Sequence, residues 1–591
     1  MRAKAGDPPR TMAQKVLAGR AEDPSLSGDF TVVKVDQVAL SRQPGRVLAE
    51  AASYGLKKAA VEVAIAYDGR AVVSTVDAPA SATAAEYLSH GVLVGRPGVG
   101  FPGAVHLERF ASPARLCLTD DPRLASSGGV GMLTVLAPPS QLAEALVTGR
   151  VTLRPPRSIQ VQLTGRVRPF VCARDVALEL IRRGLGEAVR RVEAQHRAPV
   201  VLEFVGASAR LLSVAERAVL ASLAPELGAW AVVFTSDERT EVYLRDQRRS
   251  KAHRALAPDA GAPTEEIVQI DLSAVDPLLR DEQGKVRSVR DLAGKPVTQA
   301  LLGGDSGATL RDLLAAAALL KSKRVPPRLD LLLAVPTRQM LEVLAAEGAL
   351  TDLVATGARL IEPDLRVLTG EMYPPPEDGA VSVRTSDPEP ASPGRGFVVA
   401  SAETLAFAVA TGEIGDPRGF KRPVRVTVPR TLPTDDVLVA REKRPVDAGA
   451  KRAIASFAAA APWKAAQSLA VVAGSSLASI SAPCLVVCAS LDEARAATQA
   501  ALNGASHVRA VVAESLPSSL SMCLAGVGAA ALICDAAAMA TLRAAKAVNL
   551  PAPAAEITLA VGGAKLAASW CASRVERDWA CAGSARTPSR K

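Results

Sequence analysis

The stretch from Arg96 to Met132 holds the side chains with the most obvious chemical capacity. It combines six glycines with His106, Glu108, Asp120 and Asp121, groups that can take up and release protons. Glycine lets the backbone approach a ligand closely or adopt a positive φ. The pattern therefore indicates either a pocket built from glycine-rich loops or two surface turns around an edge strand.

Strand-like and helix-like segments alternate around this stretch. Apolar runs typical of strands occur at 30–35, 61–67, 200–206, 297–304 and 329–336, and helical patterns at 12–19, 140–148, 173–182 and 309–323. Residues 212–240 indicate a helix, a stop at Gly228, a strand and then an acidic loop. This alternation predicts an α/β fold with doubly wound, largely parallel sheets.

Composition limits the classes of protein to which the chain can belong. Its 591 residues are enough for three or four domains with a large buried core. The formal net charge of +10 would suit a nucleic-acid partner. The basic residues, however, are spread among Asp and Glu, and aromatic residues that could stack on bases make up only 3%. The sequence therefore favours a dispersed, solvated charge pattern over a nucleic-acid-binding surface.

The eight cysteines are scattered, without the spacing of a zinc or iron–sulfur site. Cys484 and Cys488 lie in an apolar, strand-like run, so we expect buried thiols there. The sequence shows no signal peptide and no long apolar span. We therefore expect a cytoplasmic protein without a membrane segment.

The stretch 96–132 resembles the aconitase and isopropylmalate dehydratase family in its compact bacterial form. The family carries RPGNGICHQVHLERF and then GSDSHTPTAGGLGM; this chain has RPGVGFPGAVHLERF at 96–110 and SSGGVGM at 126–132. The resemblance covers most of 11–417 strongly and 451–591 weakly. It implies an aconitase-like fold, with three α/β/α domains around a cleft and a C-terminal swivelling α/β domain. It also implies an edge hairpin at 151–169.

The side chains that do acid–base chemistry in the family are replaced here. Gly103 stands where the family has the histidine of its Cys-His-Gln motif, and Arg123 stands where the family has the histidine of its Asp-Ser-His motif. Asp121 keeps the first residue of that second motif. Asp68 keeps the first residue of an Asp-His-Asn motif whose histidine is Gly69 here. The resemblance thus implies a vestigial pocket that has lost its histidines.

Two other charged residues of the glycine-rich stretch match the family. His106 and Glu108 belong to the shared VHLERF run, but the family's acid–base histidine lies three residues earlier. We therefore interpret both as structural.

The family binds a [4Fe–4S] cluster through three cysteines, and the matched positions here hold other residues. Asp305 stands where the first cysteine belongs, in a turn that reads G-S-C-T-N in the family. Leu365 and Leu368 replace the two cysteines of C-G-P-C. Because thiolates hold iron–sulfur clusters, these replacements imply that no cluster is bound, and we expect no other cofactor or metal.

Charged residues around the matched cleft also differ. The family's N-S-S-Y-E-D has a glutamate before its last aspartate, whereas here Arg311 precedes Asp312. Pro388 replaces a substrate-binding arginine, and Leu491 replaces another in the C-terminal domain. The aspartates that remain at matched positions are Asp68, Asp121 and Asp312. Without these guanidinium groups, the three carboxylates would repel a tricarboxylate, so we doubt that such a substrate binds.

The sequence divides into five segments. They are a leader (1–10), an aconitase-like large region of three α/β/α subdomains (11–417), a proline-containing linker (418–450), a swivelling domain (451–581) and a basic tail (582–591). Within the swivelling domain we predict strands at 484–488, 508–512 and 530–534 and helices at 491–503 and 535–546.

Three functions stay open at this level. The one we favour is a degenerate, catalytically inactive aconitase homologue, a pseudoenzyme that works with a protein partner not identified by the sequence. The second is a hydro-lyase for a citrate-like hydroxy acid, whose altered site binds a hard ion such as Mg²⁺ through Asp305, Asp121 and Asp68. If Asp305 is not a metal ligand, we expect it to be a helix cap or a charge at a helix N-terminus. The third is an RNA-binding or regulatory module, as RNA binding occurs among aconitase relatives.

Overall fold

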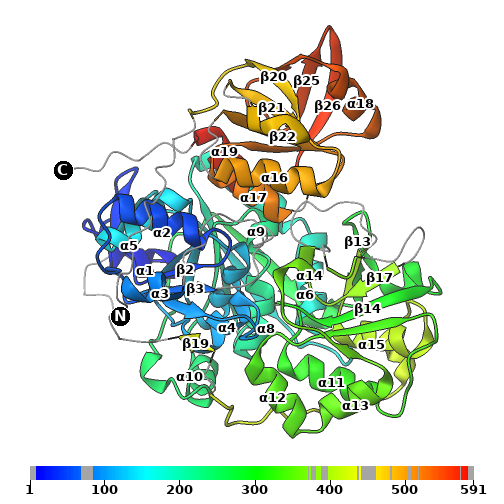
Figure 1. The fold of residues 1–591 in the computed structure, drawn as a ribbon. Helices are drawn as coiled ribbons and strands as arrows, with labels where there is room; N and C mark the ends of the chain where they lie inside the picture. The colour runs from blue at the N-terminus through cyan, green and yellow to red at the C-terminus, as the bar shows by residue number, and fades with distance from the viewer. Residues whose placement is uncertain are drawn as a thin grey trace.

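Sheets with helices on their faces, followed by a closed barrel, make up the protein (Figure 1). The computed structural model describes residues 8–67, 84–305, 307–369, 372–374, 381–387, 397–434, 438–440, 461–479, 482–502, 507–516, 518–572 and 574–583. Within these ranges the strands of the three large sheets are mainly parallel. The predicted α/β class with doubly wound sheets is thereby confirmed. The predicted leader and basic tail fall almost entirely outside the described residues.

The first sheet has the strand order β19-β4-β3-β2-β5-β6. Its strands are β2 (Gln37–Leu40), β3 (Val63–Tyr67), β4 (Leu93–Gly95), β5 (Leu116–Thr119), β6 (Leu133–Leu136) and β19 (Val439–Ala440). Its helices are α1 (Met12–Ala18), α2 (Pro44–Ser53), α3 (Ala84–Ser89), α4 (Pro102–Arg109), the 3₁₀ helix η1 (Pro122–Val130) and α5 (Pro139–Thr148). Strand β19 comes from the segment that we predicted to be a linker, and it pairs antiparallel with β4. That segment therefore also adds an edge strand to the first sheet.

The second sheet has the all-parallel order β10-β9-β8-β11. Its strands are β8 (Arg157–Thr164), β9 (Val200–Val205), β10 (Ala231–Phe234) and β11 (Glu266–Asp271), and its helices are α6 (Ala173–Arg182), α7 (Leu185–His196), α8 (Val214–Ala221), α9 (Ala224–Leu227) and α10 (Glu238–Asp246). Gly228 ends α9 with a φ of +72°, as its position predicted. The predicted acidic loop is wrong, because Asp237 caps α10 there by accepting from the backbone N–H groups of Arg239 and Thr240.

The hairpin predicted at 151–169 is also wrong. Strand β7 (Arg150–Leu153) pairs antiparallel with β1 (Thr31–Lys34) in a separate two-stranded sheet, whereas β8 joins β9 and β11. The two consecutive strands therefore belong to different sheets.

The third sheet has the order β13-β12-β18-β17-β14-β15-β16. Its strands are β12 (Leu278–Arg280), β13 (Val286–Ser288), β14 (Val297–Gly303), β15 (Asp330–Ala334), β16 (Arg359–Leu360), β17 (Val381–Arg384) and β18 (Phe397–Ala400); its helices are α11 (Leu310–Leu320), α12 (Arg338–Ala346), α13 (Ala349–Thr356), α14 (Leu365–Thr369) and α15 (Ala402–Thr411). Short 3₁₀ helices complete the second and third regions and the barrel: η2 (Ser250–Ala252), η3 (Leu272–Ala274), η4 (Val289–Leu292), η5 (Pro417–Phe420) and η6 (Gly474–Ser479).

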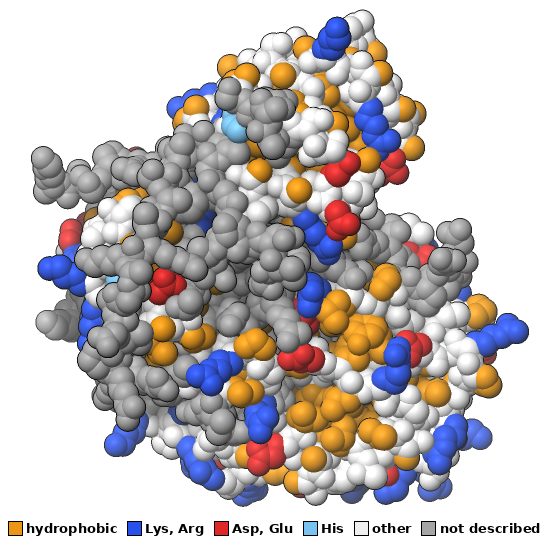
Figure 2. Space-filling model, in the orientation of Figure 1, with side chains coloured by type: hydrophobic (Ala, Val, Ile, Leu, Met, Phe, Trp, Pro, Cys, Tyr) orange, Lys and Arg blue, Asp and Glu red, His pale blue; other side chains and the backbone are white. Residues whose placement is uncertain are grey.

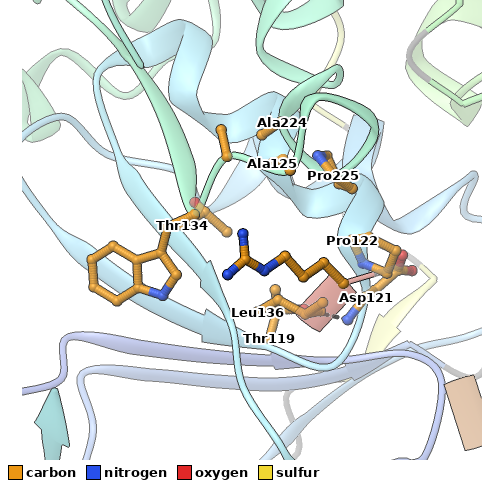
Figure 3. A pocket seen from close by; sticks show the side chains of 12 residues that line it. Thr119, Asp121, Pro122, Ala125, Thr134, Leu136, Ala224 and Pro225 are labelled. Carbon is orange, nitrogen blue, oxygen red and sulfur yellow. Dashed lines mark hydrogen bonds between the residues drawn. The ribbon is translucent and has the colours of Figure 1, made fainter. Parts of the chain in front are cut away.

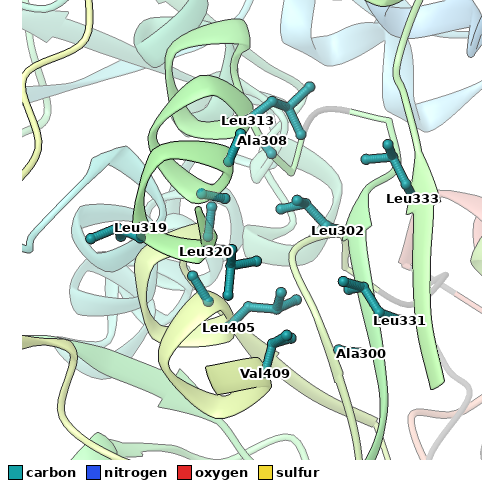
Figure 4. Packing of buried hydrophobic residues seen from close by; sticks show 14 of the residues in the cluster. Ala300, Leu302, Ala308, Leu313, Leu319, Leu320, Leu331, Leu333, Leu405 and Val409 are labelled. Atoms are coloured by element: carbon teal, nitrogen blue, oxygen red, sulfur yellow. The ribbon is translucent and has the colours of Figure 1, made fainter. Parts of the chain in front are cut away.

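Leucines and small side chains form the core of the third sheet. Helices α11 and α15 cover one face of β14 and β15 (Figure 4), and the residues that meet there include Leu302, Leu313, Leu320, Leu331, Leu333, Leu405 and Val409. Each fully buried leucine contributes about 1.5–3 kcal/mol relative to exposure. This packing gives the turn after β14, which carries Asp305, a rigid support.

The C-terminal domain closes on itself as a barrel in the order β20-β21-β22-β23-β26-β25-β24. Its strands are β20 (Gln467–Ala473), β21 (Cys484–Val487), β22 (Val508–Ala513), β23 (Ala530–Ile533), β24 (Ala547–Leu550), β25 (Ile557–Val561) and β26 (Ala564–Trp570), and its helices are α16 (Leu491–Leu502), α17 (Ser518–Gly526), α18 (Ala536–Ala544) and α19 (Arg574–Ala582). The predicted strands and helices of this domain are confirmed, as are the buried thiols of Cys484 and Cys488. Helices α16, α17 and α19 lie on the side of the barrel that faces the large region (Figure 1).

Charges on the visible surface are mixed. In Figure 2 the Lys and Arg side chains are spread over the visible face, with Asp and Glu side chains among them, as a dispersed pattern predicts. Within the described ranges, every helix is too short or too polar to cross a bilayer.

Candidate functional site

The glycine-rich stretch is a buried junction rather than a surface loop. Residues 102–109 form helix α4, and 122–130 form η1, with nearly every side chain buried. A β-carbon on Gly128 would lie 1.9 Å from the carbonyl oxygen of Val232, and one on Gly129 2.5 Å from the amide nitrogen of Ala218. The edge-strand interpretation is therefore wrong. These glycines allow η1 to press against β10 and α8.

His106 is fully buried among neutral partners. Its Nε2 donates to Gln37 Oε1 (3.0 Å), and its Nδ1 accepts from the Tyr67 hydroxyl (3.1 Å). Burial lowers the pKa of His106 to about 3. With both ring nitrogens bonded, the imidazole holds α4 against β2 and β3, in agreement with the structural interpretation.

Glu108 is held in the same helix by a different partner. It accepts from the Thr337 hydroxyl (2.8 Å), and burial raises its pKa to about 7. Thr337 also caps α12 by accepting from the backbone N–H of Met340. Glu108 thus links the first sheet region to the third.

Asp120 and Asp121 follow β5 and bind the loop before α2. Asp120 accepts from the backbone N–H groups of Ser41 (2.7 Å), Arg42 (3.1 Å) and Gln43 (2.7 Å). Asp121 accepts from the Ser41 hydroxyl and from Arg42 Nη2 (3.2 Å). Asp121 is therefore not the uncompensated carboxylate that we expected, because Arg42 neutralises it inside the protein.

Asp305 and Gly103 occupy adjoining space. A β-carbon on Gly103 would lie 2.9 Å from Asp305 Oδ1 and 2.8 Å from the carbonyl oxygen of Arg123. Asp305 is 1% exposed, and its pKa is raised to about 7 by burial, although Arg123 and Arg42 favour the charged form. Asp305, which the resemblance assigns to the first cluster-cysteine position, thus lies against Gly103, which it assigns to a histidine position.

Asp305 does not cap the following helix. Helix α11 begins at Leu310, and its cap is Thr309, which forms a reciprocal capping box with Asp312. The cap interpretation of Asp305 is therefore wrong, and Asp312 has a structural role in α11. Arg311 is exposed on the same turn, with its Nη1 3.7 Å from Asp312 Oδ1.

Leu365 and Leu368 lie in an apolar cluster. They are 1% and 2% exposed, and they pack with Phe101, Leu301, Leu332, Ala334, Ile361 and Val367. Phe101 comes from the glycine-rich stretch and is itself 1% exposed. Apolar side chains therefore fill the space around both positions that the resemblance assigns to the second and third cluster cysteines.

An arginine–carboxylate network that sequence reasoning missed lies beside this site. Asp387 binds Arg174 and Arg280 (2.8 Å to Oδ1), and Arg280 also binds Glu226. Arg123, which the resemblance assigns to the second histidine position, donates from Nη2 to the carbonyl oxygen of Asp387 (3.1 Å). These residues come from η1, α6, α9, β12 and the segment after β17, and no short motif links them in the sequence.

The described residues hold no group of three or more His, Cys, Asp or Glu side chains arranged for a metal ion. Their eight cysteines are all free thiols, seven of them buried. Asp68, which we considered as a metal ligand and pocket residue, lies outside the described residues, as does Pro388. The structure thus brings together Gly103, Arg123 and Asp305, with Asp121 paired to Arg42 next to them.

Comparison with known proteins identifies the family of the chain. Residues 80–283 match the model of the aconitase family (aconitate hydratase). The 3-isopropylmalate dehydratase large subunit 1 of Deinococcus radiodurans is 32% identical over 390 residues, which are 64% of this chain and 86% of the relative. The chain belongs to the aconitase and isopropylmalate dehydratase family.

Other relatives have related names. The chain is 28% identical over 431 residues to the 3-isopropylmalate dehydratase large subunit 2 of Archaeoglobus fulgidus, covering 70% of this chain and 99% of the relative. It is 30% identical over 393 residues to the homoaconitase large subunit of Thermus thermophilus, covering 64% of this chain and 89% of the relative. Its homologues in this family are therefore hydro-lyases.

Proposed function

We propose that this member of the aconitase family has lost cluster-dependent hydro-lyase activity and acts as a non-catalytic protein. The observation that carries the proposal is the apolar packing of Leu365 and Leu368 against Phe101. A [4Fe–4S] cluster needs thiolate ligands and space for its iron and sulfide. Leucine side chains supply no ligand, and the aromatic ring occupies the neighbouring volume. We infer that the residues present do not fit the cluster.

The acid–base groups support the same proposal. Gly103 and Arg123 stand where the family has histidines, and Arg123 is engaged with Asp387. A guanidinium group keeps its proton near neutral pH and so cannot serve as a general base there. Asp121 is bound by Ser41 and Arg42. None of these three residues therefore supplies the free proton acceptor that the family's histidines provide.

A protein partner is the second part of the proposal. The relatives are named as large subunits. We therefore infer that this chain has kept the ability to associate with another polypeptide after catalysis was lost. Nothing in the described residues favours the RNA-binding alternative or the hard-metal hydro-lyase over this one.

The test is anaerobic reconstitution of the full-length protein with iron and sulfide. Bound iron, labile sulfide and visible absorbance are measured, and hydration of aconitate and isopropylmaleate is assayed on the same sample. An aconitase that retains the three cysteines, treated in parallel, is the positive control. We expect neither cluster nor turnover. Stoichiometric iron and sulfide with turnover would contradict the proposal, and turnover with added Mg²⁺ or Mn²⁺ alone would favour the altered metal site.

A further inference from the structure

Arg574 connects the barrel domain to the large region. It is the first residue of α19, and its Nη1 lies 2.5 Å from Oε2 of Glu193 on α7. The two side chains are 40% and 21% exposed. The pair is thus partly shielded from solvent and salt, and it joins residues that are 381 positions apart.

The same arginine lines a pocket of the large region. The pocket holds about 30 Å³, and its other walls come from β5, β6, η1, α9 and the turn before β10 (Figure 3). Most of the wall is apolar, with Leu136, Ala224, Pro225 and Trp230 among its residues. The aliphatic part of an arginine can cover such a surface while its charged end reaches a carboxylate at the rim. Arg574 lines the pocket and also pairs with a carboxylate, that of Glu193 on α7.

A second contact lies on the neighbouring helix α17. A β-carbon on Gly526, its last residue, would lie 2.7 Å from Nε2 of Gln43, just before α2. The barrel domain therefore touches the large region through two helices. The nearest atoms all belong to the Gln43 side chain, so this contact brings α17 close to α2 without an ion pair.

We propose that Arg574 is a latch that holds the barrel domain closed on the large region. Its pocket is also lined by Asp121 and Pro122, which directly precede Arg123. The closed domain therefore covers the start of η1 and the edge of the arginine–carboxylate network. Release of Arg574 from Glu193 would uncover α9 and the start of η1. This proposal does not depend on whether the chain is an enzyme.

The test compares the Arg574→Ala variant with the wild-type full chain. Hydrogen–deuterium exchange is followed at 224–230, the part of the pocket wall on α9 and the turn after it, and small-angle X-ray scattering gives the radius of gyration. We expect exchange there to speed up by about two- to fivefold, the range for a partly exposed ion pair, with a larger radius. Arg543→Ala, which removes an exposed arginine of α18 in the same domain, should change neither quantity.

Two further measurements separate a latch from general damage to α19. Glu193→Gln alters the large region alone and should speed exchange at 224–230 as Arg574→Ala does, while the exchanged pair Glu193→Arg with Arg574→Glu should restore the wild-type rate. Raising salt should accelerate wild-type exchange and leave Arg574→Ala unchanged. The proposal would be overturned if Arg574→Ala and Glu193→Gln both kept the wild-type exchange rate and radius of gyration. It would also be overturned if each single variant opened and the exchanged pair did not restore the wild-type rate.

Discussion

At residue scale, positions 103 and 305 limit each other's side chains. The carboxylate of Asp305 lies in the direction in which a side chain at 103 would project, with only 2.9 Å between Oδ1 and an added β-carbon. A histidine at 103 and Asp305 in its present place would therefore collide. The glycine at 103 and the aspartate at 305 are therefore structurally coupled.

A substitution at Gly103 tests this coupling. We expect Gly103→Ala to lower the free energy of unfolding by about 1–3 kcal/mol, the usual cost of overpacking a buried site. Adding Asp305→Ala should recover part of this cost but not all, because the carbonyl oxygen of Arg123 remains 2.8 Å away. Urea unfolding of the two single variants and the double variant gives the coupling. Additive effects of the two substitutions would show that the residues do not interact.

At element scale, helix starts explain both successes and failures of the sequence analysis. The helix at 173–182 was predicted with the bounds that α6 has in the structure. Helix α10 was missed because its acidic first turn resembles a polar loop, although Asp237 caps it and Glu238 suits the helix N-terminus. Strands β7 and β8 were misjudged because strand partners depend on distant segments.

The capping box of α11 gives a prediction at this scale. Thr309→Ala removes the hydroxyl that accepts from the backbone N–H of Asp312 (3.2 Å), so we expect a loss of about 0.5–2 kcal/mol in unfolding free energy. Thr541→Ala, inside α18, keeps its helix cap and should be neutral or slightly stabilising, since alanine has the higher helix propensity. Chemical denaturation compares the two. Equal effects would mean that the box does not stabilise α11.

At the scale of the whole molecule, buried carboxylates make stability depend on pH. Burial raises the pKa of Asp305, Asp175, Glu108 and Glu403 to about 7 from ordinary values near 4. Between about pH 4 and 7 the folded protein therefore holds more protons than the unfolded chain. Stability should fall as pH rises through this window, by up to about 1.4 kcal/mol per pH unit for each group.

The Asp305→Asn variant isolates one of these groups. Its amide does not titrate, so its stability should decline less steeply than that of the wild type between pH 5 and 7. The pH slopes of the two unfolding free energies should differ by at most about 1.4 kcal/mol per pH unit, the value for one proton. This difference in slope should disappear above about pH 8, where the carboxyl of Asp305 is ionised in both the folded and the unfolded state. Unfolding free energies from urea at several pH values provide the measurement. Parallel pH profiles for the two proteins would mean that Asp305 is already ionised at pH 5.

The amino-acid sequence by itself determined the α/β class, several of the helices and strands in the large region, and the absence of cysteine at positions 305, 365 and 368. These follow from local periodicity, capping residues and motif spacing, which are read directly along the chain. Tertiary structure alone decided that Arg42 neutralises Asp121, that Asp305 abuts Gly103, and that Arg123, Arg174 and Arg280 gather at Asp387. It also decided that Arg574 reaches Glu193. Each of these contacts joins residues from different sheets, helices or domains, and their meeting depends on how whole layers pack.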